Sequence, residues 1–468
     1  MILNPSIKNI HCIGVGGIGV AALAEILWNS GYRVTGSDCR MGERAIYLRD
    51  LGLNIHEGHQ TRLDEAVDLV VYSSAITGNN PELKQAKERG IPCFSRGQVM
   101  AELFNAKQGI AVVGSHGKTT TTSLVSYLLI DAGFDPSCLV GGIMGGVHSP
   151  CIRGDGDWMV VEGDESDRSF LYLKPKIAVV TNIDRDHLVN YNNSYEELLE
   201  SFVLFLNQLP SDGVAILNGD DPGVQAIIPR LVCRKVITGS DEKADLRLKN
   251  YRLEGLRSVF TFRCYGQDYE IVLNLPGHHN IMNALVVCAL SLEMKINTNR
   301  LRSALKQFPG VGRRFQCRAC LPYRGGEVMI IEDYGHHPHA IKVTVEAVIR
   351  SWPESRMIMV FQPHRFSRTR DCMQEFVQVL APLPYVFLVD VYAAGEMPLD
   401  GGSSSCLSSA LKAHSEGYTR LVESMSVLPE VLSTIVQPGD IILLQGAGDI
   451  GSQAQGIESH LLQGSHEL

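Results

Sequence analysis

The chain has 468 residues, of which 45% are apolar and 20% are charged, and its formal net charge is −9. This composition is typical of a globular protein, and the length predicts two to four domains. The net negative charge gives no basis for general nucleic-acid binding. Because the first residues lack the apolar core of a signal peptide and no later segment has the length of a membrane span, we expect a cytoplasmic protein without membrane contact.

The first predicted strand, over residues 8–13, runs into the glycine-rich turn Gly14-Val15-Gly16-Gly17-Ile18-Gly19, and a helix is expected over residues 20–30. Such a turn lets backbone N–H groups approach a diphosphate. The next predicted strand ends in Asp38, about where an acid often binds a ribose hydroxyl. The turn alone fits a nicotinamide or flavin dinucleotide as well as the diphosphate of a UDP-sugar.

A further predicted strand, over residues 69–72, is followed by Ser73 and Ser74. In a parallel sheet the carboxyl ends of the strands lie at one edge, so these two hydroxyls should lie near the glycine turn. We therefore expect the candidate diphosphate site to contain Gly16, Gly17, Ile18, Gly19, Asp38, Ser73 and Ser74.

The most specific motif follows an apolar strand that ends at Val113, and it reads Gly114-Ser115-His116-Gly117-Lys118-Thr119-Thr120. It is a shortened phosphate-binding loop, because the usual first glycine position holds Val112. The glycines allow backbone N–H groups to surround phosphate oxygens, Lys118 can reach the terminal phosphates, and Thr119 can bind Mg²⁺. Two phosphate sites in one chain predict two phosphorylated reactants.

Polar residues also follow the strands predicted over residues 158–162 and 177–182. Glu162 ends the first of these strands and suits direct or water-mediated Mg²⁺ binding beside a phosphate loop. His187 follows the second strand and is either a ligand at the same edge or only the partner of a helix cap.

The alternation of strands and helices predicts an α/β protein with three domains. We expect domain boundaries near residues 107 and 310, which gives domains 1–106, 107–310 and 311–468. The third block carries predicted strands over residues 357–361, 385–390 and 441–444 and is expected to form another open α/β sheet.

Taken together, these motifs resemble the Mur ligases of peptidoglycan synthesis, over nearly the whole chain. The resemblance rests on the two glycine turns, residues 162–167, Asp186-His187, residues 277–283, Arg313-Arg314-Phe315 and residues 333–338. Residues 361–365 and 390–396 are more similar to the alanine-adding branch than to later ligases of the pathway. Small departures are Glu332, Ala340 and Val189-Asn190, which stand where the family often has other residues.

The resemblance implies a Rossmann-like amino-terminal domain that binds a UDP-sugar, a central ATPase domain with a mostly parallel sheet, and a Rossmann-like carboxyl-terminal domain that closes over the site. The implied activity joins L-alanine to the lactyl carboxylate of UDP-N-acetylmuramate through an acyl phosphate, with ATP and Mg²⁺. Such an enzyme acts in cell-wall biogenesis, cell shape and cell division, and we expect a monomer or homodimer.

Residue roles follow from the same resemblance. The expected catalytic residues are Lys118, Glu162, His187, Arg314 and Asp333, with Thr119, Glu162 and His187 as metal ligands. The expected ATP-binding residues are Gly114, Ser115, His116, Gly117, Lys118, Thr119, Thr120, His279, Asn280, Asn283, Arg314, Asp333 and His336. The amino acid is expected at Tyr334, Arg365 and Arg368. Asn280 and Asn283 could instead cap the helix that follows them.

Three alternatives stay open from the sequence. A recycling ligase of the same family would attach a ready-made peptide instead of free L-alanine. A nicotinamide-dependent oxidoreductase would use the first glycine turn and Asp38, and a non-enzymatic regulator would only bind the nucleotide. As a further hypothesis, Gly310 and Gly312 act as a hinge for domain closure, with a second hinge candidate near residue 107.

Overall fold

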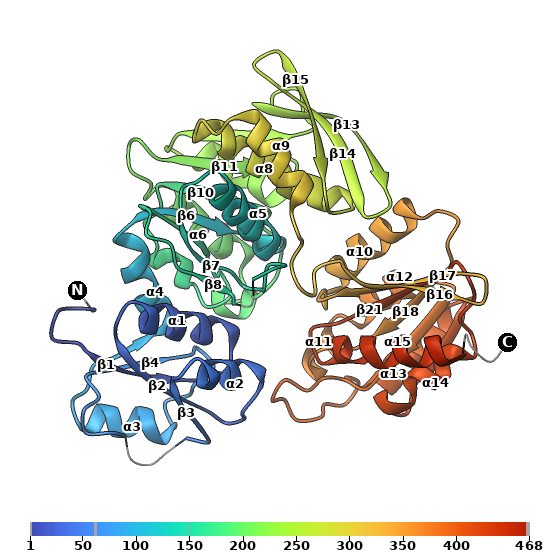
Figure 1. Cartoon of the computed structure of the whole chain (residues 1–468), viewed down its shortest axis with the longest axis horizontal. Helices are drawn as coiled ribbons and strands as arrows, with labels where there is room; N and C mark the ends of the chain where they lie inside the picture. Colours follow the sequence, from blue (N-terminus) through green and yellow to red (C-terminus); the bar gives the residue numbers. More distant parts are fainter. Residues whose placement is uncertain (1, 60–62, 148, 465–468) are drawn as a thin grey trace. The chain divides into compact units, whose positions relative to one another are not determined.

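The computed structural model describes residues 2–59, 63–147 and 149–464. It divides into two compact units. Unit 1 comprises Met1–Tyr251, Phe260–Leu273 and Met282–Pro309, and unit 2 comprises Arg252–Val259, Asn274–Ile281 and Gly310–Leu468. Three mostly parallel sheets with helices between their strands make up the fold, which is the α/β architecture that the sequence predicts (Figure 1).

The first sheet of unit 1 has the strand order β3-β2-β1-β4-β5, and all four pairs of neighbouring strands in it are parallel. Helix α1 lies on one side of this sheet and α3 on the other (Figure 1). The elements are β1 (Asn9–Ile13), α1 (Ile18–Asn29), β2 (Arg33–Asp38), α2 (Glu43–Asp50), β3 (Asn54–Glu57), β4 (Leu69–Tyr72), α3 (Pro81–Glu88), β5 (Cys93–Ser95) and α4 (Arg96–Asn105).

The second sheet has the order β15-β14-β13-β12-β11-β10-β6-β9-β7-β8. Its phosphate-loop strand β6 pairs in parallel with β9 and β10. Its strands are β6 (Gln108–Val113), β7 (Ser137–Leu139), β8 (Cys151–Ile152), β9 (Trp158–Glu162), β10 (Ile177–Val180), β11 (Val214–Asn218), β12 (Lys235–Gly239), β13 (Leu246–Glu254), β14 (Arg257–Cys264) and β15 (Gln267–Leu273). The accompanying helices are α5 (Lys118–Asp131), α6 (Tyr195–Leu206), α7 (Pro222–Ile227), α8 (His278–Glu293) and α9 (Thr298–Gln307).

The first two sheets share one hydrophobic core. Residues of α1 and α4 belong to the same buried cluster as residues of β6, β9 and β10. The ring of Phe104 lies so close to Gly109 that a Cβ at Gly109 would come within 2.1 Å of it. The chain near residue 107 is therefore packed tightly on both sides, while the domain boundary expected there stays a prediction.

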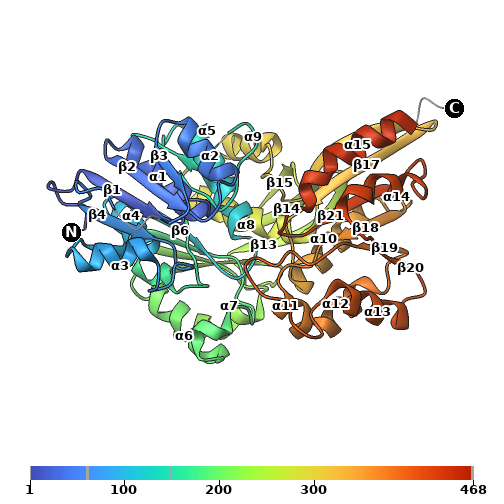
Figure 2. The same cartoon turned by 90° about the horizontal axis from the view of Figure 1, so that it is seen from below.

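The third sheet lies in unit 2 and has the order β16-β17-β21-β18-β19-β20. Helices α14 and α15 lie on one side of it and α12 and α13 on the other (Figure 2). Its strands are β16 (Gln316–Tyr323), β17 (Gly326–Asp333), β18 (Met357–Phe361), β19 (Tyr385–Leu388), β20 (Tyr418–Leu421) and β21 (Ile441–Gln445). Its helices are α10 (Pro338–Ser351), α11 (Phe366–Asp371), α12 (Met373–Leu380), α13 (Ser404–His414), α14 (Leu428–Ser433) and α15 (Gln453–Gly464).

Strand β16 pairs antiparallel with β17, while the other four pairs of neighbouring strands in this sheet are parallel. The sequence prediction did not include this hairpin, because β16 is an edge strand in which only Leu321 and Tyr323 are buried, and polar residues interrupt its apolar ones. No helix in the described ranges is long and apolar enough to cross a membrane.

Candidate nucleotide and ligase site

The phosphate loop connects β6 to α5. Gly117, directly before α5, has φ +78°, and a Cβ there would lie 2.7 Å from the Asn283 side chain. The left-handed backbone turns the chain sharply, so that the first N–H groups of α5 face the end of β6. With the positive end of the helix dipole at the same place, this loop is suited to bind phosphate.

Lys118 forms an ion pair with Glu165 inside this loop. Its Nζ lies 2.8 Å from Oε1 and 2.7 Å from Oε2 of Glu165, whose side chain is 2% exposed. Burial alone would lower the pKa of Lys118, but the charges of Glu165 and Glu162 raise it above its usual value. Burial raises the pKa of Glu165 to about 7, against the attraction of Lys118. The short contacts favour the ionised pair, which holds the ammonium beside the loop.

Glu162 and Thr119 provide oxygen ligands at the start of α5. Thr119 Oγ1 donates to Glu162 Oε1 at 3.1 Å, and the backbone N–H of Gly141 donates to Glu162 Oε2 at 2.9 Å. A hydroxyl and a carboxylate side by side beside a phosphate loop fit Mg²⁺, which prefers a few oxygen ligands and the phosphates of the substrate. Gly141 was not predicted from the sequence, since it lies in a loop without any motif.

The two histidines of this edge each have an acidic neighbour. His116 Nε2 lies 3.1 Å from Asp184 Oδ2, and His187 Nε2 lies 3.6 Å from Asp186 Oδ2. His187 precedes a short 3₁₀ helix with a φ of +57°, and its side chain is 36% exposed. Its side chain makes no cap hydrogen bond to that helix. The metal-ligand role of His187 stays a prediction.

The expected UDP-sugar residues gather at the carboxyl edge of the first sheet. Asp38 Oδ2 accepts a hydrogen bond from the N–H of Gly16 at 2.8 Å. A Cβ on Gly14 would lie 3.0 Å from Ser73. The structure therefore brings Asp38, the glycine turn and Ser73 together, while Ser74 is exposed. Asp38 holds the turn itself, and its contact with a ribose stays a prediction.

Arg96 is a residue of this edge that the sequence prediction missed. A Cβ on Gly19 would lie 2.9 Å from Arg96 Nη1, so the guanidinium lies against the glycine turn. On its other side, Arg96 Nη2 lies 3.1 Å from Asp164 Oδ2 and 3.7 Å from Asp167 Oδ2. The arginine thus connects the first glycine turn to the acidic loop after β9. Arg96 directly follows Ser95, the last residue of β5, and this position at the carboxyl end of a strand is the sequence signal that could have identified it.

The segment at the start of α8 divides between the two units. Asn283 lies in unit 1, against Gly117 of the phosphate loop. Asn280 lies in unit 2 and donates to the carbonyl of Pro276 at 2.8 Å. Burial lowers the pKa of His279 to about 4, so this imidazole is neutral at pH 7. Since α8 begins at His278, both asparagines lie inside the helix and not at its cap position.

In unit 2, Asp333 ends β17 and is 8% exposed. Its Oδ1 accepts hydrogen bonds from Gly335 N, Thr344 Oγ1 and Gln445 Nε2 at 2.8, 3.2 and 2.7 Å, and its Oδ2 accepts from Phe315 N at 3.0 Å. The carboxylate therefore ties together β17, α10, β21 and the chain before β16. Its catalytic and ATP-binding roles stay predictions.

A cluster of aromatic and cationic groups follows Asp333. The guanidinium of Arg314 lies 4.7 Å from the ring centre of Tyr334, and His336 meets the same ring edge-on at 5.4 Å. Burial, with Arg368 and His364 next, lowers the pKa of His336 to about 3. Burial and the same arginine lower the pKa of His364 to about 4. Both imidazoles are neutral at pH 7, and the positive charge of the cluster lies on its arginines.

The remaining arginines of unit 2 differ in their surroundings. Arg313 donates to Glu332 Oε1 at 2.8 Å and to the carbonyls of Gly446 and Gly448 at 2.8 and 2.7 Å, which makes it a structural residue. Arg368 Nη1 approaches His364 Nδ1 at 3.4 Å, and Arg365 is exposed with a φ of +71°. Arg368 thus lies beside His364, whose ring centre is 5.3 Å from that of His336, and both arginines stay candidates for binding an anionic group.

Three family models match the chain in succession. The Mur ligase family catalytic domain matches residues 9–108, the Mur ligase middle domain residues 112–291, and the Mur ligase glutamate ligase domain residues 313–448.

Proteins similar to this chain cover nearly all of it. UDP-N-acetylmuramate–L-alanine ligase from Methylococcus capsulatus is 42% identical over 97% of both chains, and the Coxiella burnetii protein of the same name is 44% identical over 95% of this chain and 96% of its own. The crystal structure of UDP-N-acetylmuramate-alanine ligase MurC from Thermotoga maritima is similar with a TM-score of 0.84 and 28% identity, covering 97% of this chain and 99% of that one. A murein peptide ligase from Psychrobacter arcticus shares the fold with a TM-score of 0.71 and 22% identity over 97% of this chain and 98% of that chain. The chain belongs to the Mur ligase family.

Proposed function

We propose that the protein is an ATP-dependent ligase that joins L-alanine to the lactyl carboxylate of UDP-N-acetylmuramate, giving UDP-N-acetylmuramoyl-L-alanine, ADP and phosphate. The observation that carries this proposal is the phosphate loop before α5, where Lys118 lies next to the hydrogen-bonded pair of Thr119 and Glu162, together with a second glycine turn after β1. Relatives that are 42–44% identical over nearly their full length bear the name of this activity.

The chemistry requires activation of a carboxylate, because oxide is a very poor leaving group. Transfer of the γ-phosphoryl group of ATP to the lactyl carboxylate makes an acyl phosphate, and the amine of L-alanine then attacks its carbonyl carbon. Lys118 would leave Glu165 and neutralise charge on the transferring oxygens. The amine attack produces a tetrahedral oxyanion, for which the arginines of the Tyr334 cluster are the proposed stabilising charges.

Magnesium would be held by Thr119 and Glu162, with His187 as the third proposed ligand. Bound there, the ion would neutralise charge on the phosphate oxygens. The hydroxyl and carboxylate already lie within hydrogen-bond distance of each other, which supports this assignment. The protein's own part is to keep both oxygens at the start of α5, through the N–H of Gly141.

Substrate binding is divided among the residues described above. The glycine turn after β1, with Ser73, is proposed to bind the diphosphate of the UDP-sugar, and Arg365 and Arg368 the carboxylate of L-alanine. His279, Asn280 and Asn283 are proposed near the adenine. A cytoplasmic location and a monomeric or homodimeric state stay predictions.

The test measures phosphate release from ATP and Mg²⁺ with UDP-N-acetylmuramate, with and without L-alanine, while mass spectrometry follows the nucleotide product. We expect release only with both substrates, and a product heavier by one alanyl residue. Activity with a tripeptide but not with L-alanine would instead support the recycling ligase. Tight nicotinamide binding without ATP turnover would support the oxidoreductase.

A further inference from the structure

A buried carboxylate lies on the face of the first sheet that α3 covers. Glu82, in the first turn of α3, is 1% exposed. Its Oε2 accepts a hydrogen bond from Ser37 Oγ at 2.5 Å and lies 3.2 Å from His59 Nδ1. His59 Nδ1 in turn lies 3.1 Å from Ser37 Oγ. We call these three residues the Glu82 network.

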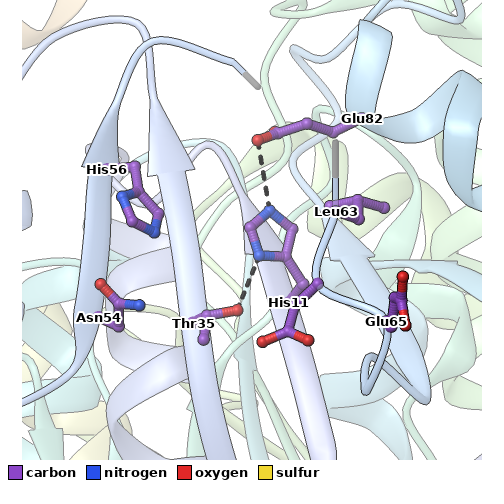
Figure 3. A pocket seen from close by; sticks show the side chains of 8 residues that line it. His11, Thr35, Asn54, His56, Leu63, Glu65 and Glu82 are labelled. Carbon is purple, nitrogen blue, oxygen red and sulfur yellow. Dashed lines mark hydrogen bonds and ion pairs between the residues drawn. The ribbon is translucent and has the colours of Figure 1, made fainter. Parts of the chain in front are cut away.

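His11 extends this network across the sheet. Its imidazole lies between Glu82 and Thr35, with Nε2 3.6 Å from Glu82 Oε1 and Nδ1 2.8 Å from Thr35 Oγ1 (Figure 3). These residues line one side of a cavity of about 450 Å³, which also contacts Asn54 and His56. The polar groups thus connect the middle of β1 and β2 to the first turn of α3.

The same stretch of β2 holds the glycine turn. The carbonyl of Ser37 accepts hydrogen bonds from the N–H groups of Gly14 and Val15 at 2.8 and 3.2 Å. The next residue, Asp38, accepts from the N–H of Gly16 at 2.8 Å. The side chain of Ser37 is therefore fixed by Glu82, while its carbonyl and its neighbour fix the turn.

A buried carboxylate is costly unless its hydrogen bonds are made, and an apolar residue of similar size is often as stable. A hydrogen-bonded network, however, fixes the position of the strand end more strictly than apolar packing does, because hydrogen bonds are directional. Groups that bind a diphosphate must be held within a fraction of an ångström. Through its hydrogen bond with Ser37, Glu82 can hold the end of β2, and with it the glycine turn, in a fixed position.

We propose that Glu82, His59 and Ser37 are positioning residues for the UDP-sugar, acting through the backbone of Ser37 and Asp38 on the glycine turn. This inference rests on the proposed function, since it assigns the UDP-sugar to that turn. None of the three residues needs to contact the sugar nucleotide for this effect. Binding of ATP, at the separate loop after β6, should not depend on them.

The experiment compares Glu82→Gln, Ser37→Ala and the double variant with Glu88→Gln, a matched control on the exposed end of the same helix. Steady-state phosphate release gives kcat and the KM values for UDP-N-acetylmuramate and ATP, well below each variant's unfolding temperature. Loss of one buried hydrogen bond should raise the KM for the UDP-sugar about fivefold to tenfold in each single variant. The KM for ATP, kcat and the Glu88→Gln control should stay within about twofold of the wild type.

In the double variant, the KM should rise less than the product of the two single effects, because both substitutions break one network. An unchanged KM for the UDP-sugar in both single variants would overturn the proposal. So would equal rises in both KM values with a lower kcat, which indicate general damage. If the wild type shows no alanine-dependent release, the proposed function fails. Calorimetric binding of UDP to the wild type and Ser37→Ala then decides the network's role, with weaker binding expected in the variant and equal binding contradicting it.

Discussion

At the scale of single residues, the ion pair of Lys118 and Glu165 stands out because it engages the lysine that nucleotide phosphates would need. We expect Glu165→Gln to lower the free energy of unfolding without nucleotide by about 3 kcal/mol, since the buried ammonium loses its charged partner. ADP with Mg²⁺ should return most of this loss, because phosphate oxygens then pair with Lys118. Thermal unfolding with and without the nucleotide measures both effects, and Glu200→Gln, on the exposed side of α6, is the control. Equal nucleotide shifts in wild type and Glu165→Gln would contradict the prediction.

Lys118 itself should be essential for turnover. We expect Lys118→Met to lower kcat by about a thousandfold, because one preorganised charge on the transferring phosphoryl group is lost. Lys243→Met, at an exposed lysine of the same unit, should be neutral. Phosphate release in single-turnover and steady-state assays measures the change, and a Lys118→Met enzyme with normal turnover would remove the lysine from the proposed mechanism.

The neutral imidazole of His336 makes the stability of unit 2 dependent on pH. Its pKa is about 3 in the fold, against an ordinary value of 6.5, because burial, Arg368 and His364 disfavour its charged form. Between pH 6.5 and about 3, the unfolded chain therefore binds a proton that the native state does not, and stability falls as the pH falls. His336→Gln should lessen this slope by about 1.4 kcal/mol per pH unit. Denaturant unfolding between pH 7 and pH 4 tests it, and parallel curves for the two proteins would refute it.

At the scale of elements, the first turn of α5 depends on the left-handed residue before it. We expect Gly117→Ala to raise the KM for ATP at least about tenfold, since the added Cβ strains the backbone by about 1–2 kcal/mol and meets Asn283. Gly133→Ala is a matched control after the other end of α5, because Gly133 has a φ of +82° and no atom within 4 Å of an added Cβ. Similar KM values for ATP in the two variants would contradict this prediction, because the substitution at Gly117 would then have no effect specific to the phosphate loop.

At the scale of the whole molecule, the junction at residue 310 is a better hinge candidate than the one at residue 107. The core continues across residue 107, whereas Gly310 begins unit 2 with a φ of +80° and no atom within 4 Å of an added Cβ. We expect Gly310→Val to lower kcat and to release more phosphate per alanyl product, because incomplete closure would expose an acyl phosphate to water. The ratio of phosphate to product measures this. Gly325→Val, at a similar backbone angle in the β16–β17 turn, is the control, and an unchanged ratio in Gly310→Val would reject the hinge.

The sequence alone determined the local chemistry and the strands that carry it. The ranges expected for β4, β9 and β18 agree with the structure, and both glycine turns lie between a strand and a helix as expected. These features follow from neighbouring residues, since apolar runs, glycines and a lysine impose their conformations within a few positions. The match to the Mur ligase models confirms the family that these motifs indicated.

Only the tertiary structure decided which distant side chains meet. It paired Lys118 with Glu165, put Arg96 against the glycine turn and Asn283 against Gly117, and buried Glu82 beneath β2. No local pattern marks these contacts, because each one joins residues that are far apart in the sequence and meet only when the helices, strands and loops pack together. The acids and arginines involved are typical of solvated surfaces in a sequence, and only burial turns them into parts of a site.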